Sequence, residues 1–284
     1  QKMAHLKTSA DTGSYQFDNI TFANYGLLAV DASQTLALNS GTITGDKNSG
    51  VVNAGTVTVP DSWTLSHMYS DKGGTITNAS GKSLTISSTG RLTHYQNNDQ
   101  ETYKLNLTLA SLTVQSGGEI NADYVGYYTQ KGPGKSTSKD IGASHGGEGY
   151  GAASSTAYGD YSNPVNLGSG GTAGCGGGAI ILTVTGTADL SGTISANGQS
   201  GGWYQSDGSG GSVNITAASI TGNGTITANG GASQTYSGVA SGGRIKLAAD
   251  SISGSLTLQA KGGKYSTYYG SAGTIYKKTT AQTY

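Results

Sequence analysis

The stretch GCGGGAIILTV (residues 174–184) is the first of four related units in this chain. The other three are GSGGSVNITAA (208–218), ASGGRIKLAAD (240–250) and GSAGTIYKKTT (270–280). Aligned on Gly178, Gly211, Gly243 and Gly273, the units lie 33, 32 and 30 residues apart. A second marker keeps the same phase, since ISANG ends at 198, ITANG at 230 and LQAKG at 262. A nearly fixed period of this length indicates a repeat architecture in which each unit stacks on the previous one.

Short segments of alternating polarity, rich in Thr, Val, Ile and Leu and bounded by Gly, Asn or Asp, indicate strands throughout the chain. Each C-terminal repeat holds two of them, and the predicted ranges are 179–185 with 192–196, 212–217 with 224–228, and 244–248 with 255–260. The same pattern predicts earlier strands at 15–22, 27–30, 35–38, 56–59, 75–77, 83–86 and 105–109. Helical periodicity is nearly absent.

Equivalent strands recur once per repeat and run in one direction, so they can pair laterally at about 4.8 Å per coil. The sequence therefore predicts an all-β fold, a right-handed, single-stranded parallel β-helix (β-solenoid) with long Gly/Tyr-rich loops on one side. We expect one domain over residues 1–284, with N-terminal coils in 1–122, a long loop insertion at 123–177 and C-terminal coils of ~32-residue repeats in 178–284. Because of its tyrosines, we expect the insertion to be ordered and packed.

Composition narrows the possible partners. Charged residues are 11% of the chain and the formal net charge is zero, which argues against a nucleic-acid partner, since such binding depends on phosphate attraction. No apolar run is long enough for membrane insertion, and no signal peptide opens the chain, so we expect the mature or excised part of a larger surface protein or oligomer. Low Lys and Arg with abundant Thr, Ser, Asn, Gly and Tyr favours an extracellular or cell-surface location. Cys175, the single cysteine, is interpreted as an inert turn residue.

The C-terminal half resembles the glycine-rich repeats of large bacterial cell-surface and secreted, adhesin-like proteins. The resemblance lies in GGRIKL (242–247), in the Ala-Asn-Gly turns and in GSAGTIY (270–276), while GASHGGEGYG (142–151) is similar to the loop that precedes such repeats. It implies an extracellular β-helix. The resemblance identifies neither a ligand nor a catalytic residue.

Tyrosine is the informative side chain, because 18 Tyr against 2 Phe and 2 Trp gives most aromatic rings a hydroxyl that suits a dry core poorly. Such rings beside small polar residues form adaptable binding surfaces, and a flat aromatic surface suits the C–H faces of sugars. The leading hypothesis is therefore non-catalytic binding of a polysaccharide, such as cellulose or another plant or cell-surface glycan; the alternative is that the rings only hold the loops in place. The candidate ligand-binding residues are Tyr124, Tyr127, Tyr128, Tyr150, Tyr158, Tyr161, Trp203, Tyr204, Tyr236, Tyr265, Tyr268 and Tyr269.

A second hypothesis is a polysaccharide hydrolase or lyase on the same scaffold. Glycoside hydrolysis needs two converging carboxylates, one with a raised pKa. The candidates are Asp123, Asp140, Glu148 and Asp160, with His145 as a base. The acids do not recur at the spacing of one coil, and the main interpretation therefore has no catalytic residue, metal site or cofactor.

Two further hypotheses need no glycan. The chain can be a structural spacer of a surface assembly, or an ice-binding protein that orders water on Thr-x-Thr ladders. The second requires those pairs to share one face, and their uneven spacing in the sequence argues against this. A trimer is also compatible with the pattern.

Overall fold

The computed structural model describes residues 3–5, 13–17, 19–38, 42–152, 156–233 and 238–280, and in these ranges the fold is all-β and built on parallel sheets. A nine-stranded sheet follows the order β1 (Met3–His5), β4 (Leu27–Val30), β7 (Gly50–Asn53), β10 (Met68–Asp71), β13 (Arg91–His94), β16 (Glu119–Asn121), β18 (Thr193–Ser195), β20 (Thr225–Thr227) and β22 (Thr257–Gln259). Every pair of neighbours in it is parallel.

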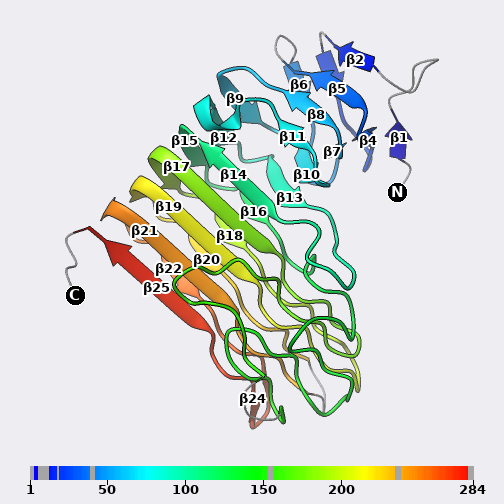
Figure 1. Ribbon diagram of the computed structural model, residues 1–284, viewed down its shortest axis with the longest axis vertical. Helices are drawn as coiled ribbons and strands as arrows, with labels where there is room; N and C mark the ends of the chain where they lie inside the picture. The colour runs from blue at the N-terminus through cyan, green and yellow to red at the C-terminus, as the bar shows by residue number, and fades with distance from the viewer. Residues whose placement is uncertain are drawn as a thin grey trace.

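An eight-stranded sheet lies in front of the nine-stranded one in Figure 1. Its strands are β9 (Ser62–Leu65), β12 (Ser83–Ile86), β14 (Leu105–Leu109), β15 (Ser111–Val114), β17 (Ala179–Leu190), β19 (Ser212–Thr221), β21 (Arg244–Ile252) and β25 (Thr274–Thr279). The long strand β17 pairs with both β14 and β15, and its register with β19 shifts between Val184 and Thr187.

Smaller elements complete the chain. A four-stranded parallel sheet near the N-terminus contains β2 (Gly13–Gln16), β5 (Gln34–Ala37), β8 (Thr56–Thr58) and β11 (Thr75–Ile76). Strand β3 (Asn19–Thr21) pairs with β6 (Thr42–Thr44), and β23 (Lys264–Tyr265) forms an antiparallel hairpin with β24 (Tyr268–Tyr269). One 3₁₀ turn, η1, covers Ala79–Gly81, and none of the described helices is long and apolar enough to span a membrane.

The register confirms both repeat markers. Gly211 and Gly243 each precede the paired strand starts, because Ala179 lies opposite Ser212 and Ser212 opposite Arg244. In the other sheet Ile120, Ile194, Ile226 and Leu258 follow one another across β16, β18, β20 and β22. Two strands per C-terminal repeat are therefore present as predicted. The N-terminal part also contains strands that the prediction missed, namely β7, β9, β10, β13 and β15; β9 and β15 alternate regularly in burial, whereas β7 is buried throughout.

The core is a column of aliphatic side chains stacked strand over strand. Ile180, Val213 and Ile245 are in register in the eight-stranded sheet and fully buried. One cluster of buried residues extends from Val30 to Ala260. Because alternate residues of a strand point to opposite faces, the other half of each strand faces outward, and β14 shows this as strict alternation of buried and exposed residues.

An asparagine ladder joins the turns that follow β16, β18, β20 and β22 of the nine-stranded sheet. The Asn197 side-chain oxygen accepts from the Asn229 backbone N–H at 2.8 Å, and the Asn229 side chain accepts from the Lys261 N–H at 2.8 Å. Asp123 occupies the first position, where its carboxylate accepts from the Asn197 N–H at 2.6 Å. The Asn of the Ala-Asn-Gly marker therefore satisfies one backbone donor of the next repeat.

The glycines on which the repeats align form a second column. A Cβ atom placed on Gly243 would lie 2.0 Å from the Gly211 carbonyl oxygen, and one on Gly273 would lie 1.8 Å from that of Gly243. These distances are far below van der Waals contact, so a larger residue must push two repeats apart.

We expect Gly243→Ala to lower the free energy of unfolding by about 2–3 kcal/mol, because the added methyl group overpacks a contact between two backbones. Urea unfolding of the purified variant measures this loss. Gly81→Ala is the matched control, since nothing lies within 4 Å of a Cβ at that position. Equal stability of the two variants would contradict the role of the glycine column.

The ladder gives a separate prediction. Asn197→Ala leaves the backbone N–H of Asn229 without its partner, and we expect a loss of about 1–2 kcal/mol in unfolding free energy. Asn223→Ala is the control, because Asn223 makes the same kind of bond, to the Ser255 N–H, at an exposed position. A ladder without stabilising effect would give the same urea midpoint for both variants.

Candidate functional site

The segments that lead into β17, β19, β21 and β25 form an inner layer of glycine-rich backbone. Each is bonded directly to its neighbour in the next repeat: the Gly177 N–H donates to the Ser209 carbonyl at 2.9 Å, Gly210 to Ser241 at 3.1 Å, and Gly242 to Ser271 at 3.0 Å. Ser209, Ser241 and Ser271 occupy equivalent positions in successive repeats, and their carbonyls therefore accept equivalent hydrogen bonds.

The long excursion between β16 and β17 supplies an outer layer on top of these segments. The same three serines donate their own N–H groups to it, Ser209 to the Ser169 carbonyl at 2.9 Å, Ser241 to Ala143 at 3.0 Å and Ser271 to Glu148 at 2.8 Å. In Figure 1 this excursion and the loops of the later repeats gather at the same lower end of the molecule, where β24 also lies. Main-chain bonds thus hold the insertion over the repeats.

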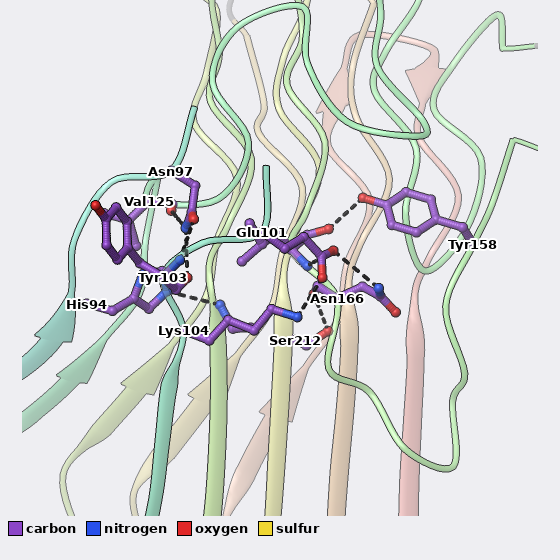
Figure 2. Close-up of polar contacts among 11 residues, drawn as sticks. His94, Asn97, Glu101, Tyr103, Lys104, Val125, Tyr158, Asn166 and Ser212 are labelled. Carbon is purple, nitrogen blue, oxygen red and sulfur yellow. Dashed lines mark hydrogen bonds and ion pairs between the residues drawn. The ribbon is translucent and has the colours of Figure 1, made fainter. Parts of the chain in front are cut away.

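A partly buried ion pair anchors one edge of the two layers (Figure 2). Glu101 accepts from the Lys104 ammonium at 2.5 Å and from the Leu167 N–H and Asn166 side chain at 3.2 Å each. Burial acts to raise the pKa of Glu101, but the hydrogen bond and charge of Lys104 and the other donors outweigh it, so the pKa is lowered. Glu101 is therefore an ionised structural acceptor that ties the chain before β14 to the end of the excursion.

Tyr158 and His145 lie inside this arrangement. The Tyr158 hydroxyl donates to the Leu167 carbonyl at 2.5 Å and contacts the Ser169 hydroxyl at 2.7 Å, and its ring lies 4.6 Å from that of His145. His145 is fully buried and its Nδ1 donates to the Gly210 carbonyl at 2.7 Å. Burial lowers the pKa of His145 to about 4, which keeps the imidazole neutral. These contacts give both residues a role in holding the two layers together.

The candidate carboxylates lie in separate local settings. Asp140 is exposed and pairs with Lys139 at 2.7 Å, while the exposed Asp160 accepts from the Ser162 N–H and hydroxyl at 2.8 Å. Glu148 is half-buried, and Asp123 belongs to the asparagine ladder, where burial raises its pKa. No group of three His, Cys, Asp or Glu residues able to hold a metal ion occurs in the described ranges. Cys175 is buried, and burial raises the pKa of its thiol.

The aromatic candidates fall into two groups by exposure. Tyr127 is 8% exposed and Tyr158 is half-buried with its hydroxyl bonded inside, so both pack within the layers. Tyr236 lies outside the described residues. The exposed candidates belong to the excursion between β16 and β17, to the loop between β18 and β19 or to β24, and they are Tyr124, Tyr128, Tyr150, Tyr161, Trp203, Tyr204 and Tyr269.

Tyrosines lie on both faces of the β23–β24 hairpin, because Tyr265 pairs with Tyr268 while Tyr269 pairs with Lys264. The Tyr265 and Tyr268 rings are stacked at 6.4 Å with an angle of 10° between their planes, and Tyr150 from the excursion meets the Tyr268 ring edge-on at 4.7 Å. Lys264 lies 5.2 Å from the ring centre of Tyr269, which is 56% exposed. We call Tyr150, Tyr265, Tyr268 and Tyr269 the hairpin cluster; it joins residues separated by more than a hundred positions.

Sequence reasoning missed the buried and partly buried polar residues that fix these loops. Glu101 belongs to no recognisable sequence motif. Asp207 is fully buried and accepts from the Gly201 N–H at 2.7 Å, the Ser233 N–H at 2.9 Å and the Ser233 hydroxyl. The sequence did contain one signal for the bonds between the layers. Ser209, Ser241 and Ser271 each lie two residues before a glycine of the glycine column.

Three buried histidines make stability depend on pH. His67, His94 and His145 are at most 1% exposed, and burial lowers the pKa of each to about 4. Above pH 6.5 the imidazole is neutral in both states; as pH falls from 6.5 toward 4 only the unfolded chain takes up the proton, so stability is lost in that window. We expect each histidine to remove about 2 kcal/mol of unfolding free energy between pH 7 and pH 5.

The measurement is urea unfolding at both pH values for the native chain and for His145→Gln. The variant retains a side-chain donor for the Gly210 carbonyl but cannot titrate, so its loss of stability should be about 2 kcal/mol smaller. An unchanged pH dependence would show that His145 is not held neutral.

Comparison with known proteins provides no relative from which a role can be transferred. No family model, curated protein or solved structure matches the chain.

Proposed function

We propose that this protein is a non-catalytic, extracellular polysaccharide-binding module of a surface adhesin, built as a right-handed, single-stranded parallel β-helix. The order of the sheets supports the architecture, because the chain adds one strand to each sheet in turn and equivalent strands pair in parallel. Right-handed crossovers between parallel strands are the general rule. The long loops, which gather at one end in Figure 1, form the binding side.

The hairpin cluster is the observation on which the binding proposal rests. Tyr150 and Tyr269 are 38% and 56% exposed, although large aromatic rings generally favour burial. Ring-to-ring contacts hold Tyr150, Tyr265 and Tyr268 in place, and Lys264 lies over the ring of Tyr269, so these side chains would lose little conformational entropy when a ligand binds. Sugar C–H groups can lie on such rings while the tyrosine hydroxyls meet sugar hydroxyls.

The threonine pairs give less support to ice binding. Thr56 and Thr75 belong to the four-stranded sheet, Thr183 to the eight-stranded sheet and Thr225 to the nine-stranded sheet. The pairs therefore lie on different faces and cannot form one flat array that orders water.

Replacing Tyr150 and Tyr269 together by Ala should weaken retention on the bound polysaccharide about tenfold, since aromatic residues dominate binding at such surfaces. Retention is measured by pull-down on insoluble cellulose, xylan, chitin and pectin, with released reducing sugar assayed in the same supernatants. Unfolding in urea should change little, because both side chains are largely outside the core.

Tyr25→Ala is the matched control, as Tyr25 is 62% exposed on the turn before β4, and β4 lies far from β24 in Figure 1. Retention lost equally in both variants would contradict the hairpin as the site. Release of sugar would contradict the non-catalytic proposal, and absence of retention on all four polymers would leave the spacer hypothesis.

A further inference from the structure

A groove crosses the outward face of the eight-stranded sheet at its last strands. Its cavity volume is about 380 Å³, and its floor is formed by small side chains, including Thr216 of β19 and Ala248 of β21. Lys246, Tyr276 and Lys278 rise from β21 and β25, and Ser162 of the excursion closes one side. Lys246 alternates with the buried Ile245 and Leu247, which shows that the groove lies on the side away from the core.

The strand register brings two positive charges together in this groove. Lys246 pairs with Tyr276 and Ala248 pairs with Lys278. The two lysines therefore lie on the same face, one strand and two residues apart, with Cα atoms about 8 Å from each other. In the described ranges neither forms an ion pair within 4.0 Å. Asp250 also lines the groove, which leaves one excess positive charge.

The wall contributed by the excursion is fixed before any ligand arrives. The Asn214 side chain on β19 donates to the Asn163 side-chain oxygen at 3.0 Å, and the Tyr161 ring meets the Tyr276 ring edge-on at 5.6 Å. Asp160 accepts both donors of Ser162. A pre-formed, concave site with an aromatic wall, hydroxyls and two cations suits an anionic ligand that also carries C–H and hydroxyl groups.

We propose that this groove binds an acidic sugar residue of the polysaccharide, with its carboxylate or sulfate between Lys246 and Lys278 and its ring against Tyr276. This inference rests on the proposed polysaccharide binding and assigns the substrate class, an anionic glycan. The chain as a whole has no net charge. Selectivity for acidic polymers would therefore come from this local pair of lysines.

The test is affinity electrophoresis of the native chain, Lys246→Gln and Lys278→Gln in gels that contain polygalacturonate or its fully methyl-esterified form. The two polymers share one backbone and differ in charge. Dextran sulfate and dextran form a second arm that separates sulfate from carboxylate recognition. We expect retardation only by a charged polymer, and about tenfold weaker binding for each variant, because a charge-assisted hydrogen bond is lost.

Lys277→Gln is the matched control, since it removes the same charge from the neighbouring position of β25, which does not line the groove. A Lys277 variant as weak as the other two would show diffuse attraction and would overturn the proposal. Equal binding of charged and neutral polymers that survives all three substitutions would overturn it too, yet would leave polysaccharide binding at the hairpin cluster intact. Absence of binding to every polymer would overturn both.

Discussion

Close contact between glycine backbones of successive repeats is the constraint on which the rest of this structure depends. At Gly211, Gly243 and Gly273 the preceding repeat lies so near that no side chain fits. The same closeness lets the N–H groups of one repeat reach the carbonyls of the next outside any strand, so that segments between strands are also joined by main-chain hydrogen bonds. Glycine therefore serves as the packing residue of the loop layers, in the way that aliphatic side chains serve the core.

Burial of a loop normally leaves backbone polar groups without partners, which is why most loops stay at the surface. Here the inner layer is covered by the excursion because serines at equivalent places bond in both directions. A few side chains supply the other polar contacts between these segments. Asp207 links two loops, Glu101 receives Lys104 and two amide donors, and His145 stays neutral so that burial carries no charge penalty.

The sequence predicted the period, the parallel pairing and the two strands of each C-terminal repeat, because regular spacing maps directly onto strand register. Strands such as Met68–Asp71 and Arg91–His94 were missed because they carry charged or polar residues where alternation was expected. His94, for example, is buried and accepts from the Ala179 N–H at 3.1 Å, a long-range contact that no local pattern contains. The hairpin cluster was foreseen only as a set of tyrosines, since its contacts join the excursion to a hairpin more than a hundred residues later.

The way in which the loops are held together also determines how this fold can present a binding surface. Because main-chain bonds and glycine contacts hold the loop layers, most outward side chains of those loops are not needed for folding. Tyr127 and Tyr158 differ from the exposed aromatic residues of these loops, because they pack between the layers. A surface released in this way can concentrate aromatic rings at the hairpin and two lysines on the last strands, although average composition shows neither. A neutral chain poor in charge can therefore present a locally cationic, aromatic groove, and its position on the register of β21 and β25 follows from the repeat that builds the fold.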